Sequence, residues 1–242
     1  MKSNQLIEIE NVKNANRVLK NLLERSRTEV VGMGLFYGRA GHGKSRWGIK
    51  TAQMNGYVYM RLEANMSVKD FLVGLLGRLL SKTMPHFEVK GTINCIYNQV
   101  LDFLHSEMDT VVVVDEINYA FHNKKILETI RDLSDESLAT FIMIGMEDAK
   151  EKMIQMSSHF FDRCNSFYLF QSLNLSDTEL ILNEICDVKI DEQLVKYIHK
   201  QSNGKMRIIN KYIDALERIG KRMNKNELTY DEIKDIITKV EA

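Results

Sequence analysis

The 242-residue chain is 44% hydrophobic and 27% charged, which is enough apolar material for one large domain or for a domain with a small appendage. This balance excludes a disordered or fibrous chain. Its 33 basic and 33 acidic side chains cancel, so any contact with nucleic acid must come from local patches rather than from the summed charge.

Three cysteines, Cys95, Cys164 and Cys186, are far apart, odd in number and outside metal-ligand spacing. This pattern indicates free, buried thiols in a reducing compartment. The first ten residues carry acidic side chains and lack the apolar core of a signal peptide, and no run is long enough to span a bilayer. We therefore expect a cytoplasmic protein with no membrane partner.

Five short runs rich in β-branched or aromatic residues are predicted to be strands. They span residues 30–37, 57–62, 110–114, 141–145 and 167–170. Apolar residues at helical spacing lie between them, at 68–80 and 93–104, and Ser67 with Asp70 provides a helix-start signal before the first of these. The alternation predicts an α/β fold, a mostly parallel five-stranded sheet flanked by helices.

Beyond about residue 172 the strand-like runs stop and three helical patterns follow. Ser176 with Glu179 is predicted to open the first of them, and Thr229 with Glu232 the last. We therefore predict an α/β core over residues 1–172 and a small all-α domain over residues 173–242.

The segment from Gly38 to Ser45 fits the pattern G-x-x-x-x-G-K-[ST] between a predicted strand and a predicted helix. Such glycines let successive backbone N–H groups surround a β-phosphate, while Lys44 reaches the β and γ oxygens and the Ser45 hydroxyl ligates Mg²⁺. The alternative is a glycine-rich turn that precedes Lys-Ser by chance. The expected contacts of ATP here are Gly38, Gly41, His42 through its backbone, Gly43, Lys44, Ser45 and Arg46.

A second motif is the valine run 111–114, which is followed directly by Asp115 and Glu116. Asp115 is predicted at the carboxyl edge of the sheet, where it holds magnesium together with Ser45. Glu116 is then placed to polarise the water that attacks the γ-phosphate. Taken alone, two adjacent acids merely end a strand in solvent, and the pairing with the glycine-rich loop favours the catalytic interpretation.

Together these residues resemble an AAA+ ATPase, with a lid-like helical domain after the P-loop core. A narrower resemblance, to the B-protein (MuB-like) ATPases of transposing phages, rests on the strings 115–118, 130–133 and 144–147. It implies an ATPase of a bacterial or phage-infected cell that binds double-stranded DNA without sequence preference and forms ATP-dependent oligomers. It also implies that the protein selects transposition targets and activates a transposase.

The resemblance assigns roles to two arginines. Arg163 stands where AAA+ proteins place a finger that reaches the γ-phosphate of a neighbouring subunit, with Arg131 as a rival and a surface pair with Asp162 as the plain alternative. Arg207 resembles the second sensor, an arginine that touches the phosphates from the lid. The usual short polar first sensor is missing at the strand end near 145, where Glu147 or a backbone group is the substitute.

Two basic segments are candidates for DNA contact. Residues 199–225 contain eight Lys or Arg against two acids, and residues 11–27 contain five against one. An oligomer that repeats such patches multiplies weak phosphate contacts, although an ordinary solvated helix face is an equal alternative. Lys124 and Lys125 form a third candidate.

Two other functions stay open at this stage. One is a replication helper of the helicase-loader or origin-binding type, and the other is a nucleotide-gated scaffold with little turnover.

Overall fold

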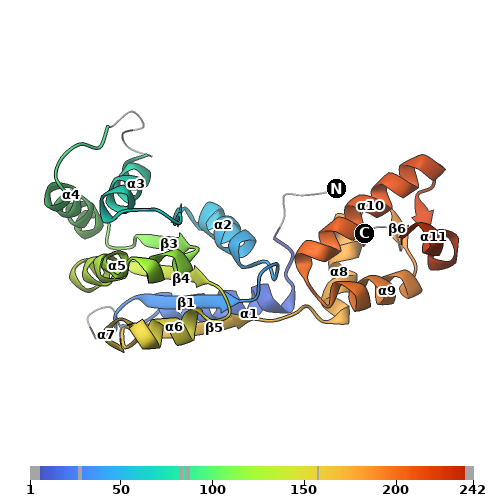
Figure 1. The fold of residues 1–242 in the computed structure, drawn as a ribbon, viewed down its shortest axis with the longest axis horizontal. Helices are drawn as coiled ribbons and strands as arrows, with labels where there is room; N and C mark the ends of the chain where they lie inside the picture. Colours follow the sequence, from blue (N-terminus) through green and yellow to red (C-terminus); the bar gives the residue numbers. More distant parts are fainter. Residues whose placement is uncertain (1–5, 27–28, 82–83, 85–87, 157, 238–242) are drawn as a thin grey trace. The chain divides into compact units, whose positions relative to one another are not determined.

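The computed structural model describes residues 6–26, 29–81, 84, 88–156 and 158–237 (Figure 1). Contacts within the chain divide it into two compact units. Among the described residues, one unit contains 15–38 and 44–169 and is called the sheet unit. The other contains 6–14, 39–43 and 170–237 and is called the helical unit.

The strands and helices have the following bounds. The strands are β1 (Met33–Gly38), β2 (Val58–Arg61), β3 (Val111–Asp115), β4 (Thr140–Gly145), β5 (Cys164–Phe170), β6 (Lys189–Ile190) and β7 (Glu227–Leu228). The helices of the first 169 residues are α1 (Glu10–Leu23), α2 (Lys44–Asn55), α3 (Val68–Leu80), α4 (Ile93–Ser106), the 3₁₀ helix η1 (Ile117–His122), α5 (Lys124–Ser137), α6 (Ala149–Met156) and α7 (Ser158–Phe161). The remaining helices are α8 (Leu175–Ile185), α9 (Glu192–Ser202), α10 (Met206–Met223) and α11 (Tyr230–Ile237).

Strands β1 to β5 form one sheet in the order β2-β3-β4-β1-β5. The ladders β2–β3, β3–β4 and β4–β1 are parallel, which confirms the predicted five-stranded α/β fold. Because β4 lies between β1 and β3, the loop after β1 and the residues after β3 flank the end of the same strand. This order brings the two sequence motifs to the carboxyl ends of the parallel strands.

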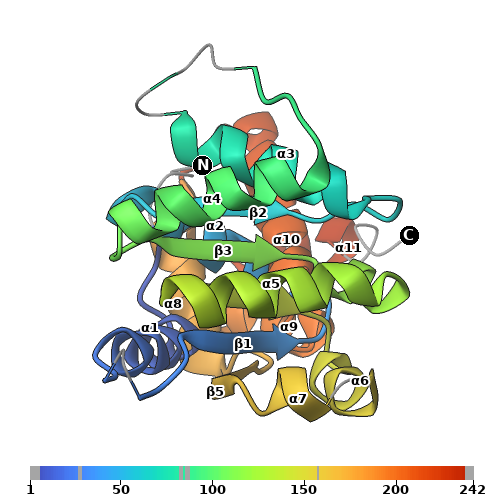
Figure 2. The ribbon, with the colours of Figure 1, turned by 90° about the vertical axis from the view of Figure 1, so that its left-hand side faces the viewer.

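Helices cover both faces of the sheet. Helix α2 packs against strands β1, β2, β3 and β4. Helix α5 packs against β4 and also contacts α3 and α4. Figure 2 shows α5 running in front of β1 and β3, with α2 behind them. Helix α3 begins with the predicted capping box, because Ser67 Oγ accepts from the N–H of Asp70 and the Asp70 carboxylate accepts from the N–H of Ser67.

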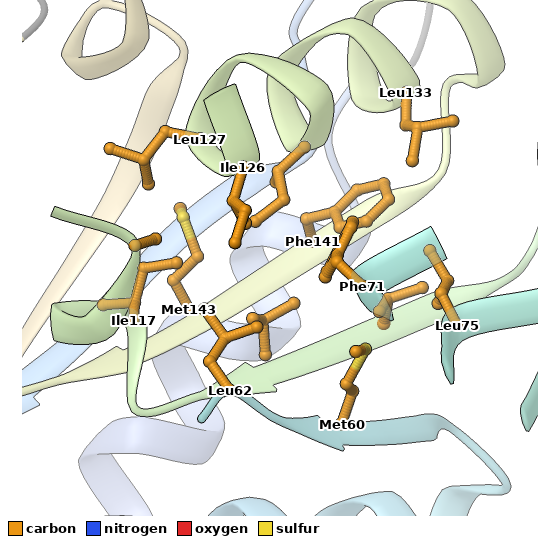
Figure 3. Packing of buried hydrophobic residues seen from close by; sticks show 14 of the residues in the cluster. Met60, Leu62, Phe71, Leu75, Ile117, Ile126, Leu127, Leu133, Phe141 and Met143 are labelled. Carbon is orange, nitrogen blue, oxygen red and sulfur yellow. The ribbon is translucent and has the colours of Figure 1, made fainter. Parts of the chain in front are cut away.

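The main core lies between the sheet and the helices on the α5 side. Figure 3 shows Phe141 and Met143 of β4 near Ile126 and Leu133 of α5, and all four are at most 2% exposed. Alternate residues of β4 point to this face because side chains in a strand alternate. Burying one such side chain contributes about 1.5–3 kcal/mol, so this core holds the strand ends, and the motifs on them, in register.

The region after residue 172 is helical, as predicted, but it differs in two details. Its described residues, 173–237, form four helices rather than three, and the two-residue strands β6 and β7 pair in parallel, so the region is not purely α. Helix α8 is capped by Asn174, whose Oδ1 accepts from the N–H of Asp177 at 2.7 Å, and not by Ser176 with Glu179. Asn174 is the N-cap because it lies directly before the first helical residue, where its side-chain oxygen can reach the free N–H groups.

The three cysteines are free, but only two of them are buried. Cys164 and Cys186 are buried, whereas Cys95 is exposed, contrary to the sequence prediction, because it lies on the solvent side of α4. Burial raises the pKa of the Cys164 thiol to about 12, which keeps this sulfur protonated and unreactive at neutral pH. None of the described helices is long and apolar enough to cross a membrane.

Candidate nucleotide-binding site

The glycine-rich loop joins β1 to the first turn of α2. Gly41 has a φ of 86° and Gly43 a φ of 91°, a region that favours glycine. A Cβ at Gly43 meets nothing within 4 Å, so the requirement for glycine there is the backbone conformation and not space. A turn of this kind at a helix N-terminus directs backbone N–H groups at one point and is suited to bind an anion.

Lys44 and Ser45 occupy the first turn of α2. Lys44 is only 7% exposed, and its Nζ donates to the carbonyl of Gly38 at 2.6 Å, so the ammonium group folds over its own loop. Ser45 and Arg46 follow and are half-buried. His42 is 3% exposed and its Nδ1 lies 3.2 Å from the carbonyl oxygen of Phe170, which leaves only its backbone to face a ligand.

Asp115 ends β3 and is 2% exposed. Its Oδ1 accepts from the backbone N–H of Glu116 at 2.8 Å, and its Oδ2 accepts from the hydroxyl of Tyr59 at 2.6 Å. Within the described part of the chain, neither oxygen takes part in an ion pair. A buried carboxylate without a cationic partner is costly, and this one fits the oxygen chemistry that Mg²⁺ prefers.

The register of the sheet fixes where Asp115 lies relative to β1. Phe36 pairs with Ile144, and the preceding residue of β4, Met143, pairs with Val114. Asp115, the next residue of β3, is therefore level with Phe36, two residues before the end of β1, and lies two strand spacings or about 10 Å from β1. That separation across the sheet is large enough for a phosphate group and a metal ion.

Asn118 lies against the residues that follow β4, a contact that sequence reasoning missed. Its Oδ1 accepts from the N–H of Met146 at 2.6 Å, and its Nδ2 donates to Asp148 at 3.3 Å. A Cβ at Gly145 would lie 2.7 Å from Ala149 Cβ, so η1 and α6 close tightly over the end of β4. The structure thus brings a short polar side chain to the strand end where the sequence offered Glu147 or a backbone group.

Glu116 has a left-handed backbone, with φ 58° and ψ 42°. This conformation costs a non-glycine residue about 1 kcal/mol or more and is common at functional sites. Its Oε1 lies 3.1 Å from Nη2 of Arg61, at the end of β2. The proposed water-polarising carboxylate is thus paired with a cation that the sequence analysis did not select.

Arg61→Gln is expected to raise ATP turnover by the isolated protein about threefold, because the ion pair draws negative charge from the oxygen that polarises water. Arg61 is 62% exposed, so its loss costs little stability. Steady-state phosphate release measures the effect. Arg78→Gln, an exposed arginine that bonds only locally to Gly74 within the described residues, is the matched control. Unchanged or lower turnover in Arg61→Gln contradicts this restraining role.

Arg163 lies near the start of β1, whereas the glycine-rich loop follows the other end of this strand. Nδ2 of Asn165 donates to the carbonyl of Val31 at 2.8 Å, which sets the start of β5 beside the start of β1. The loop follows the other end of β1, and a six-residue strand is about 20 Å long. Arg163 therefore lies about one strand length from the end of β1 that leads into the loop.

The two rival arginines each form an ion pair, and the pair with Asp162 that was the plain alternative for Arg163 is not the one that forms. Nε of Arg163 pairs with Asp135 at 3.2 Å, and not with Asp162. Arg131, within α5, pairs with its neighbour Asp132 at 2.6 Å. Both arginines are held by a carboxylate from α5.

Arg207 is the second residue of α10, and its backbone approaches the glycine-rich loop inside the helical unit. Its N–H donates to the carbonyl of Gly41 at 3.2 Å. A Cβ at Gly41 would lie 3.3 Å from Cβ of Arg207, so a side chain there would crowd the start of α10. The structure therefore brings Arg207 to the loop through the main chain.

A family model described as AAA domain matches residues 27–153, just over half of the chain. The chain belongs to the AAA domain family. Members of this P-loop ATPase family bind nucleotide, typically with Mg²⁺, and are generally ATP hydrolases. No curated protein matches the chain.

Solved structures of AAA+ proteins share the fold. The Aeropyrum pernix ORC1 protein in complex with DNA aligns with a TM-score of 0.65 at 14% identity, over 98% of this chain and 66% of that one. The ORC2 protein of the same organism, in ADPNP–ADP complexes, gives 0.68 at 14% identity over 98% and 70%. A variant of Thermotoga maritima RuvB gives 0.61 at 16% identity over 94% and 67%. The AAA domain chain thus spans about two thirds of each, and identities this low show the fold alone.

Proposed function

We propose that this AAA domain protein is an ATP-hydrolysing subunit that assembles with copies of itself on double-stranded DNA, without sequence preference. The observation that carries the proposal is the placement of the charged residues on the sheet. The loop with Lys44 and the acids Asp115 and Glu116 share one edge, and Arg163 lies at the other. One copy therefore provides the residues that bind ATP and presents Arg163 to the ATP site of the next copy.

The chemistry follows from these positions. The triphosphate of ATP lies on the loop, and Lys44 compensates the charge of its β- and γ-phosphates. Ser45 and Asp115 are the residues that hold Mg²⁺, which when bound neutralises phosphate charge. Glu116 orients and polarises the attacking water. Arg207 adds a contact to the phosphates beside the loop.

The second copy supplies Arg163. This side chain lines a cavity of about 400 Å³ together with Asp135 and Asp162, so it has space to leave Asp135. Its guanidinium group stabilises transition-state charge only when another subunit docks head to tail. Such heterologous contacts build rings or open helical filaments, so assembly and turnover are coupled.

Helix α10 of the helical unit offers the best surface for DNA. Its apolar stripe, including Ile209, Tyr212 and Leu216, is buried, and its cations are on the exposed side. These exposed cations are Arg207, Lys211, Arg218, Lys221 and Arg222. Arg218 bonds to Asp214, and the others face solvent along about four turns of helix.

The other two basic candidates are weaker. Arg25 donates to the carbonyls of Leu22, Val30 and Leu138 and to Thr140, so it is a structural anchor, and Arg27 lies outside the described residues. Lys124 at the start of α5 is close to Glu128. Neither segment presents as many exposed cations on one face as α10 does.

Reversing two charges on α10, with Lys211→Glu and Arg222→Glu together, is expected to weaken duplex DNA binding at least about tenfold and to reduce its salt dependence. Fluorescence anisotropy of a labelled duplex, with a non-hydrolysable ATP analogue, with ADP and without nucleotide, measures both quantities. The proposal expects tight binding only with the analogue. Lys196→Glu, at an exposed position of α9, is the control variant. Nucleotide-independent binding, or none, contradicts the proposal.

For the protein that this subunit serves, we propose a transposase, because the strings 115–118, 130–133 and 144–147 resemble MuB-like proteins. Origin binding or helicase loading is the second candidate, favoured by the likeness to an ORC1 structure solved with DNA. Pull-down of purified transposase against replicative helicase, with ATP and DNA present, separates the two. ATP binding without DNA-stimulated phosphate release would instead favour a scaffold.

A further inference from the structure

The edge strand β2 holds the buried acid of the site through a tyrosine. The hydroxyl of Tyr59 donates to Oδ2 of Asp115 at 2.6 Å, a length typical of a hydrogen bond to a charged carboxylate. Tyr59 pairs in register with Val113, two residues before Asp115 on the neighbouring strand. No sequence motif contains this residue, and the mechanism above does not use it.

Two donors fix the Asp115 carboxylate from opposite sides. The N–H of Glu116 holds Oδ1, and the hydroxyl of Tyr59 holds Oδ2. The torsion that turns a carboxylate group is broad when nothing restrains it. With both oxygens held, the plane of the group is set, and each oxygen keeps a lone pair for a further ligand.

We propose that Tyr59 is a positioning residue for the Mg²⁺–nucleotide complex and orients Asp115 for the metal. The inference rests on the proposed function, because it assumes that the site takes Mg²⁺ with ATP. Partners that orient a metal-binding side chain contribute about 10-fold to 100-fold to metal affinity. Removing only the hydroxyl, with Tyr59→Phe, leaves the ring and its packing in place. The expected effect is thus on the metal and not on the fold.

The chain supplies a matched control in Tyr97 of α4. Its hydroxyl donates to Oε1 of Glu136 at 2.9 Å, also a bond from a partly buried tyrosine to a carboxylate, and neither residue belongs to the candidate site. Tyr97→Phe therefore removes the same kind of bond from the same sheet unit. Thermal unfolding of both variants compares their structural cost.

The test is a Mg²⁺ titration of the binding of a fluorescent ATP analogue to the full chain. Tyr59→Phe is expected to raise the half-saturating Mg²⁺ concentration about tenfold. Analogue affinity in EDTA should stay unchanged, and turnover should return towards the unaltered value at saturating Mg²⁺. Tyr97→Phe should leave the titration as it was.

An unaltered Mg²⁺ dependence in Tyr59→Phe, or equal shifts in both variants, overturns the positioning role while leaving the proposed ATPase intact. Failure of the unaltered chain to bind the analogue with Mg²⁺ overturns the proposed function, and the role of Tyr59 with it. The two failures are therefore distinguishable in one set of titrations.

Discussion

Glu116→Gln is expected to lower ATP turnover at least about 100-fold while leaving ATP binding intact. The amide has the shape of the carboxylate but does not polarise water as a charged group does, and the glycine-rich loop is unchanged. Because hydrolysis resets the assembly, the variant should remain oligomeric and bound to DNA in the presence of ATP. Phosphate release, equilibrium ATP binding and electron microscopy with duplex DNA measure the three outcomes.

The control for this substitution is Glu128→Gln on α5, which removes a carboxylate that makes only a long surface contact with Lys124. It should hydrolyse ATP at the unaltered rate. Normal turnover in Glu116→Gln shows that another group polarises the water. Loss of ATP binding instead assigns Glu116 a structural role, since its strained backbone follows Asp115 directly.

The parts of the site that are contiguous in sequence could be predicted, because each motif carries its own geometry. The loop needs glycines in a left-handed conformation next to a lysine, and Asp115 must end a buried strand, so both patterns are visible in the residues alone. The alternation of strands and helices likewise predicts the parallel sheet. The fold and the phosphate-binding end of the site follow from such local signals.

Contacts across the sheet could not be predicted. Tyr59 and Arg61 meet Asp115 and Glu116 only because β2 pairs with β3 in one register, over a separation of more than fifty residues. A register shifted by one residue would turn both side chains to the other face. Likewise, Asp135 as the partner of Arg163 depends on how α5 packs beside the start of β5. The strands β6 and β7 are too short to show an alternating pattern at all.

Mixing two inactive variants should restore ATP turnover if the site is shared between copies. Lys44→Ala loses the phosphate contact but keeps Arg163, and Arg163→Ala loses the finger but keeps the loop. Each alone is expected to fall about 1,000-fold or more in turnover, the contribution typical of an arginine finger. In an equal mixture, about one interface in four joins an intact loop to an intact finger, so about a quarter of the activity should return. Phosphate release at a fixed total concentration measures it.

Arg131→Ala decides between the rival fingers in the same assay. Arg131 sits within α5 and pairs with Asp132. If Arg163 is the finger, loss of Arg131 should leave turnover nearly unchanged. The pair of Arg163 with Asp135 is more than a quarter exposed on both sides, so breaking it costs about 0–1 kcal/mol and does not unfold the protein. A mixture that stays inactive therefore excludes completion in trans by Arg163. If Arg131→Ala is inactive alone and regains turnover when it is mixed with Lys44→Ala, the role passes to Arg131. Arg163 lies about one strand length, or about 20 Å, from the end of β1 that leads into the loop. Because of this separation, turnover in the mixture requires Arg163 from a second copy.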